Sequence, residues 1–175
     1  LLDKLRRHGA DVVFSTPPWD PDRLQACVAR GPHSSANVHA EFVRNEMSDF
    51  VEKGFWTVLP FRLASTLPNF RLSPLGVVPQ RERRPRLIVD LSFSGVNADT
   101  VRQAPPEAMQ FGRALTRLLT TIRHADPAHG PVHIIKVDIA DGFYRVGLAP
   151  QSAPGLSVLL PKAPREEQMV AIPFV

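Results

Sequence analysis

The residues best suited to chemistry lie in the stretch from Ile134 to Val146, where two carboxylates and an aromatic pair accompany an apolar run. The run is β-branched and follows a Gly-Pro pair, a pattern that predicts a buried strand. Asp138 at its end would be poorly solvated unless a cation or hydrogen-bond donors met it. Carboxylates in this setting suit metal-bound phosphate chemistry. The alternative is that Asp138 and Asp141 only cap a turn before Gly142.

A second segment, from Leu75 to Ser92, predicts a hairpin with a cationic turn. An apolar strand ends at Pro79, a charged tip spans 80–85, and a second β-branched run follows. The arginines concentrate at and beside this tip, at Arg81, Arg83, Arg84 and Arg86. Clustered arginines indicate phosphate contact more strongly than a total charge does. A solvated surface turn is the other interpretation.

Taken together and in this order, the two segments resemble the fingers and palm motifs of reverse transcriptases of retrotransposon-like elements. The tract from Arg86 to Ser92 resembles the one that precedes the palm strand bearing the first catalytic aspartate. The tract 41–54 resembles the helix leading into the fingers. The resemblance covers about residues 37–174. It implies an RNA-directed DNA polymerase, with an RNA or DNA template-primer and deoxynucleoside triphosphates as partners.

The resemblance also implies a metal site. In nucleotidyl transfer two Mg²⁺ ions neutralise charge on the attacking and leaving oxygens. Asp138 would be the catalytic carboxylate that binds both ions, and the backbone oxygen of Ile139 would complete the coordination of one. Hard oxygen ligands of this kind suit magnesium.

A nucleotide site follows from the same resemblance. Arg86 would hold the triphosphate through bidentate contacts, assisted by Arg83 or Arg84. The ring of Phe143 would clash with a ribose 2′-hydroxyl and so favour deoxynucleotides. The residues that would line the nucleotide pocket are Asp141, Gly142 and Phe143.

Two features depart from the family's pattern. Pro85 precedes Arg86 and shifts the expected hairpin geometry, and no Tyr-x-Asp-Asp sequence occurs, so the second catalytic carboxylate motif is absent. We therefore expect the chain as given to be inactive, as a piece of a longer polymerase or a shortened derivative. A second hypothesis is a non-catalytic nucleic-acid-binding remnant that uses the fingertip arginines and the Arg113/Arg117 helix face. A third is an α+β interaction module with structural aspartates.

Composition limits the remaining choices. A chain of 175 residues with 43% hydrophobic content can bury one domain core. Its net charge of +4 favours a polyanionic partner.

Cys27 is the only cysteine, which excludes intramolecular disulfides and fits a reducing compartment. The six histidines show no zinc-ligand spacing, and we assign them no chemistry. No apolar run approaches the roughly 18 residues that span a bilayer, so we expect no membrane association and an intracellular protein, cytoplasmic or nuclear.

The order of the expected elements predicts an α+β fold of the split-βαβ kind. The resemblance implies that this fold is an incomplete right-hand polymerase, with fingers and the first part of a split-βαβ palm. Residues 1–36 read as an irregular arm around a short helix at 22–29, 37–104 as a fingers-like region and 105–175 as the N-terminal part of the palm. One helix should run from an Asn37 N-cap to Gly54, and a second from Pro105 to Ile122. The apolar cluster 55–61 should pack in the core, and a hairpin of strands 156–160 and 168–172 should close the chain.

The sugar-gating role yields a first prediction. In a completed polymerase, Phe143→Val should admit ribonucleotides, because the ring penalises only the 2′-hydroxyl bearer. Discrimination should fall by at least about tenfold, which corresponds to roughly 1.4 kcal/mol. Incorporation of both nucleotide classes would be measured for Phe143→Val and Tyr144→Val. Loss of selectivity in the Tyr144 variant alone would mean that the other aromatic residue is the gate.

Overall fold

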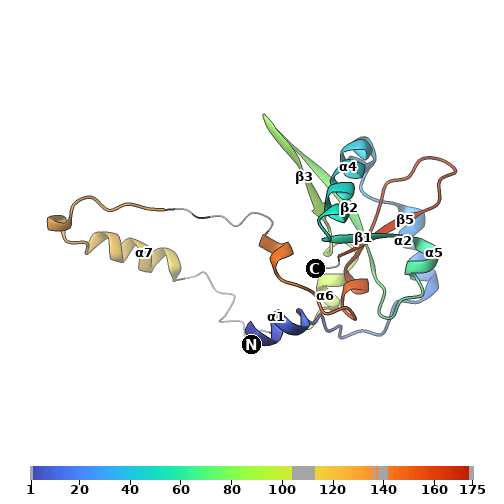
Figure 1. Cartoon of the computed structure of the whole chain (residues 1–175), viewed down its shortest axis with the longest axis horizontal. Coiled ribbons are helices and arrows are strands. Elements are labelled where there is room, and N and C mark those ends of the chain that lie inside the picture. The colour runs from blue at the N-terminus through green and yellow to red at the C-terminus, as the bar shows by residue number, and fades with distance from the viewer. Residues whose placement is uncertain (1, 104–112, 136, 138–141, 174–175) are drawn as a thin grey trace. The chain divides into compact units, whose positions relative to one another are not determined.

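The computed structural model describes residues 2–103, 113–135, 137 and 142–173. The chain divides into two compact units, one made of Leu1–Val101 with Asp141–Val175 and the other of Arg102–Ala140. The first unit contains helices and a mixed five-stranded sheet of order β1-β5-β4-β2-β3 (Figure 1). The predicted α+β class is therefore confirmed.

The sheet joins early and late parts of the sequence. Its strands are β1 (Trp56–Pro60), β2 (Leu72–Gln80), β3 (Arg83–Val89), β4 (Ser157–Leu159) and β5 (Met169–Pro173). β2 and β4 are parallel, whereas the other neighbouring pairs are antiparallel. The predicted β2–β3 and β4–β5 hairpins are both confirmed.

The described residues of the first unit also form six α-helices: α1 (Leu2–His8), α2 (Pro21–Arg30), α3 (Ser34–Val38), α4 (Ala40–Glu52), α5 (Phe61–Ala64) and α6 (Val96–Asp99). The helix predicted at 22–29 is confirmed as α2, and Asp20 caps it by accepting a 2.7 Å hydrogen bond from the Arg23 N–H. Short 3₁₀ helices cover Gly142–Arg145 and Ala153–Leu156.

The start of the 37–54 helix, predicted at Asn37, is wrong. Asn37 lies inside α3, and α4 begins after His39, whose φ of −106° and ψ of 33° interrupt the helical backbone. The predicted end is correct, because α4 stops just before Gly54, which has a φ of +74°.

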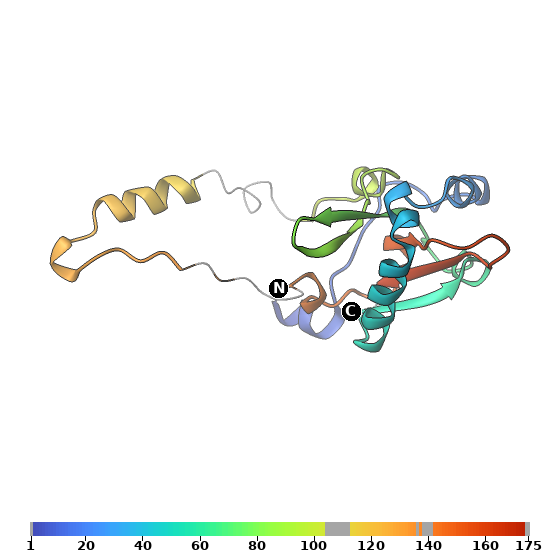
Figure 2. The same ribbon diagram turned by 90° about the horizontal axis from the view of Figure 1, so that it is seen from above.

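Strand alternation sorts the apolar side chains onto the two faces of the sheet. Leu159 and Val170 join a cluster with Trp19 and Leu24 on one face, where α2 packs. Their neighbours in sequence, including Val158, join Val43 and Met47 of α4 in the second cluster. Figure 2 shows α4 lying over the sheet. The 55–61 segment packs as predicted, with Trp56 buried in β1.

A buried arginine joins the N-terminal segment to the sheet. The side chain of Arg71 is only 1% exposed, and its Nη1 donates to Asp99 Oδ2 at 2.6 Å. Nη2 donates to the backbone oxygens of Thr16 at 3.0 Å and Pro17 at 3.2 Å. The guanidinium also lies 4.0 Å over the Phe14 ring. Burial lowers the pKa of Arg71, and the charge of Asp99 opposes that shift.

Gly155 makes room for this arrangement. A Cβ at this position would lie 2.4 Å from Cε2 of Phe14, closer than any side chain tolerates. The missing side chain lets the aromatic ring pack against both the 3₁₀ helix and Arg71.

The second unit differs from the prediction. Its described elements are α7 (Ala114–Arg123) and a 3₁₀ helix at Pro127–His129, so only the latter part of the predicted 105–122 helix lies within the described residues. The predicted buried strand from Ile134 to Val146 is wrong where the structure describes it. Ile134, Ile135 and Val137 are 70%, 83% and 82% exposed, because none of the described strands pairs with them, and 142–145 are helical.

The Arg71 cluster yields a prediction about stability. Arg71→Lys should lower the free energy of unfolding by about 3 kcal/mol, because an ammonium cannot reproduce the forked contacts to Asp99, Thr16 and Pro17, and an incompletely compensated buried pair is costly. Urea denaturation would measure the change, with Arg165→Lys on the exposed 161–168 loop as the matched control. Equal stability of the two variants would contradict the structural role.

Candidate nucleic-acid interface

The arginine cluster lies on the β2–β3 hairpin, and β3 forms an edge of the sheet. Val78 pairs with Arg86 and Gln80 with Arg83, so Pro79 of β2 faces two residues of β3, Arg84 and Pro85. A proline lacks the N–H that a regular ladder needs and is tolerated at an edge or bulge. The irregularity expected from Pro85 is therefore present. In Figure 1 the turn end of the hairpin extends away from β1 and β5.

Arg84 is held against the core by carboxylates of α4. Its guanidinium forms an ion pair with Glu46, which is buried, and lies 3.6 Å from Asp49. A buried carboxylate requires such a partner. Of the three arginines assigned to the nucleotide by resemblance, Arg84 therefore has much of its charge already neutralised.

Three other hairpin arginines present their charge to solvent. Arg81 lies 3.9 Å from Glu82, but both side chains are almost fully exposed, and such pairs contribute little. Arg83 and Arg86 are exposed and form no ion pair or side-chain hydrogen bond with the described residues. This surface can therefore bind phosphate groups without first breaking internal contacts.

The residues expected to bind metal lie outside the part of the chain that the structure describes. Asp138, Ile139 and Asp141 fall outside the described residues, and in the part that is described no group of three His, Cys, Asp or Glu could hold a metal ion. Magnesium binding therefore stays a prediction.

The nucleotide-pocket residues are described only in part. The backbones of Gly142 and Phe143 lie in a 3₁₀ helix rather than a strand. Tyr144 stacks on Phe55, with ring centroids 4.8 Å apart and planes inclined by 6°, and its centroid lies 5.2 Å from that of Phe50. The Tyr144 ring is therefore a packing residue of the second core cluster.

The hairpin ends at an aspartate whose role the sequence did not indicate. Asp90 Oδ1 accepts a 2.9 Å hydrogen bond from the Phe93 N–H, and Oδ2 lies 3.0 Å from His33 Nε2. Arg30 Nη2 lies 3.3 Å from His33 Nδ1, which fits a neutral ring that donates from Nε2 and accepts at Nδ1. This contact joins residues 57 positions apart, so no local pattern in the sequence indicates it.

These contacts change the pKa of the Asp90 carboxyl group. Its pKa is lowered, chiefly by the Phe93 N–H and further by His33, while partial burial opposes the shift. The carboxylate therefore ties the loop after β3 to His33, and we read it as a structural group at the end of β3.

Comparisons with known proteins identify no relative: no protein-family model and no curated protein matches this chain. In the part of the chain that the structure describes, no helix is both long enough and apolar enough to cross a membrane.

The Asp90 contacts yield a prediction about pH. A carboxylate with a lowered folded-state pKa stabilises the fold above its unfolded pKa of 3.8, and this contribution disappears as the pH falls through the lower folded value. Wild type should therefore be more stable than Asp90→Asn at about pH 6, and the difference should shrink below about pH 4. Urea denaturation across this range would measure it. A difference that is independent of pH would contradict the assignment.

Proposed function

We propose that this chain is the fingers and the first part of the palm of an RNA-directed DNA polymerase of a retrotransposon-like element. One observation supports this most directly: the residues that resemble the fingers motif form a hairpin on which Arg83 and Arg86 face solvent. The proposal assigns the hairpin to phosphate binding, with Arg83 and Arg86 as the contacts to a triphosphate or to the backbone of a template-primer.

Strand β3 carries two kinds of arginine, one paired with carboxylates and one not. Arg84 is paired with Glu46 and Asp49, and so it anchors the hairpin to α4. Arg83 and Arg86 lack carboxylate partners among the described residues. Their charge is available to a ligand, and arginine forks match phosphate oxygens.

The chemical step belongs to the proposal through resemblance alone. Asp138 and the Ile139 oxygen would hold Mg²⁺, which would activate the attacking hydroxyl and neutralise the leaving phosphate. The second catalytic carboxylate motif does not occur in these 175 residues. The alternative function, a non-catalytic nucleic-acid-binding remnant, would use the same hairpin without a metal.

The hairpin assignment predicts weak binding that depends on salt. An RNA–DNA hybrid should bind the 175-residue chain with an affinity that falls steeply as salt rises, because arginine–phosphate contacts release counterions. Arg86→Gln should reduce the slope of log affinity against log salt by roughly 0.7–0.9, the effect of one phosphate contact. Fluorescence anisotropy would measure both quantities.

Two matched variants sharpen this measurement. In variants that thermal unfolding shows to keep the fold, Arg84→Gln should change the affinity much less than Arg86→Gln, since the charge of Arg84 is already paired with Glu46. Arg165→Gln on the 161–168 loop should not change the affinity. An affinity that stays flat with salt, or one that falls equally in all three variants, would rule out the hairpin as the contact surface.

A further prediction separates the polymerase from the non-catalytic alternative. In a form of the protein that carries the aspartate-pair hairpin, Asp138→Asn should reduce primer extension by roughly 10³-fold or more, because it removes a ligand shared by both ions. Thermal unfolding would check that the fold is retained. Extension at the parental rate would exclude Asp138 as the ligand.

A further inference from the structure

The outer edge of β3 carries backbone groups that no described residue binds. On β2, Leu75 and Val77 direct their backbone groups away from β3, because they bond to the segment that begins α3. Their antiparallel partners on β3 are Val89 and Leu87. In a pair of this kind both residues point outward. The N–H and C=O groups of Leu87 and Val89 therefore point away from β2, and no hydrogen bond to them occurs among the described residues.

The side chains of this edge alternate between the two faces of the sheet. Leu87 and Val89 pack into the second core cluster beneath α4. Ile88 and Arg86 lie on the other face, where Ile88 is 38% exposed and Arg86 is exposed as well. Pro85 protects only the first half of the strand. An edge with free backbone groups and an exposed apolar side chain is a template for a further strand.

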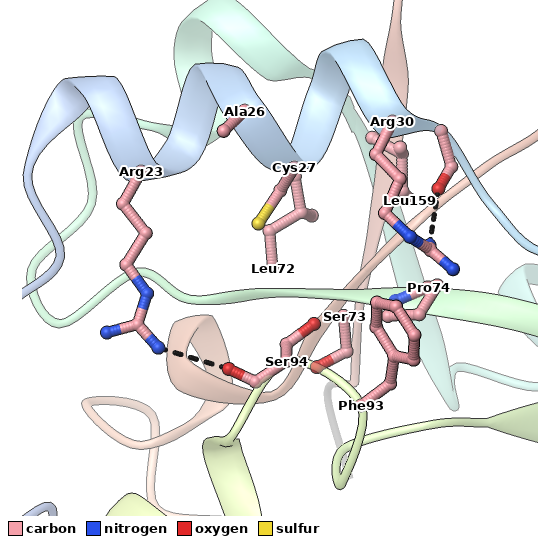
Figure 3. Close-up of a pocket in the computed structure, with 11 residues that line it drawn as sticks. Arg23, Ala26, Cys27, Arg30, Leu72, Ser73, Pro74, Phe93, Ser94 and Leu159 are labelled. Carbon is pink, nitrogen blue, oxygen red and sulfur yellow. Dashed lines mark hydrogen bonds between the residues drawn. The ribbon is translucent and has the colours of Figure 1, made fainter.

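The chain after β3 is held in place by α2, so the free edge ends at a defined point. Figure 3 shows Arg23 donating to the Ser94 oxygen, a hydrogen bond of 3.1 Å. Arg30, farther along the same helix, lies 3.7 Å over the Phe93 ring (Figure 3). The edge open to another strand is therefore the short stretch 87–89.

We infer that β3 pairs with β3 of a second copy of this chain, antiparallel across a two-fold axis at Ile88. Leu87 then lies opposite Val89 of the second copy, and the two residues exchange hydrogen bonds through all their free N–H and C=O groups. The two five-stranded sheets become one continuous sheet. Such a contact uses the same surface on both copies, as two-fold symmetry requires.

The backbone excludes the two neighbouring registers. A two-fold axis at Leu87 would place the Val89 oxygen opposite Pro85, which has no N–H to donate. An axis at Val89 would pair the Leu87 N–H with the Leu91 oxygen, which already accepts the Asn97 N–H at 3.2 Å. The proposed register avoids both losses.

Charge identifies a second copy as the partner. In this register Arg86, which forms no ion pair with the described residues, lies opposite Asp90 of the second copy. The Asp90 side chain is 32% exposed beside its contact with His33, so it can also accept from a guanidinium. Opposite charges across an antiparallel pair are stabilising. The two Ile88 side chains meet at the axis. The inference goes beyond the proposed function, because self-association requires no nucleic acid.

Disulfide crosslinking tests the register. Ile88→Cys should form a covalent dimer under oxidising conditions, because facing residues at such an axis have Cα atoms about 4.5 Å apart, within reach of a disulfide. Val78→Cys is the matched control, since Val78 is 48% exposed on the same face but lies three strand spacings, roughly 14 Å, from its copy. Ile88→Cys should yield at least about tenfold more covalent dimer. Peptide mapping would separate this link from one through Cys27.

Sedimentation equilibrium of the full chain without nucleic acid measures the affinity, so failure of this inference is distinguishable from failure of the proposed function. Wild type should dimerise with a Kd tighter than about 300 μM. Ile88→Lys should raise the Kd at least about tenfold, because two like charges would meet at the axis, and Arg86→Gln should raise it about threefold. Val78→Lys should change it by less than about twofold. Thermal unfolding would check that each variant keeps the fold.

Three results would overturn the inference. One is a wild-type chain that stays monomeric at about 300 μM, which would leave the edge to a strand of another protein. Another is an equal yield of covalent dimer from Ile88→Cys and Val78→Cys. The third is an unchanged Kd in Ile88→Lys, which would place the contact between copies on another surface.

Discussion

The ion pair between Arg71 and Asp99 is the interaction on which the first unit most depends. One guanidinium at the start of β2 binds the carboxylate at the end of α6 and the backbone oxygens of residues 16 and 17, beneath the Phe14 ring. The chain before α2 is therefore fixed to the sheet, and α2 takes its place over β2. Because Asp99 is committed to Arg71, it neutralises Arg23 only weakly. The same ion pair thus holds the N-terminal segment and leaves Arg23 without a close carboxylate partner among the described residues.

Arginines in this protein differ in role according to the carboxylates around them. Arg71 is buried and binds Asp99 and two backbone oxygens through its Nη atoms. Arg84, in contrast, is exposed along much of its length but paired at its end with Glu46 and Asp49. Arg83 and Arg86, one and two positions from Arg84, have no such partner among the described residues. The bulge opposite Pro79 lies between Arg83 and Arg86 and breaks the regular alternation of side chains along β3. Paired and unpaired arginines therefore occur close together on the same strand.

Local patterns predicted the elements that depend on local physics. The β2–β3 hairpin, the β4–β5 hairpin and α2 follow from alternation and from the turn and breaker residues that bound them. The break between α3 and α4 was missed because His39 carries no helix-breaking signal of its own. The 134–146 run was predicted as a strand from its β-branched residues, but a strand requires a neighbour to pair with, and β propensity does not supply one. The contacts of Asp90 with His33, and of Arg71 with Asp99, join distant residues and depend on tertiary packing. The expected carboxylate site at Asp138 lies outside the described residues and stays a prediction.

The central claim is that the β2–β3 hairpin contacts nucleic acid, and site-specific photocrosslinking tests it most directly. A photoreactive benzoyl-phenylalanine would replace Arg81 in the turn, or Pro164 in the exposed 161–168 loop, in the full chain. Both positions are exposed, and neither substitution removes Arg83 or Arg86. We predict a crosslink to a labelled RNA–DNA hybrid from position 81 and little or none from position 164. Equal labelling from the two positions, or labelling from 164 alone, would contradict the account.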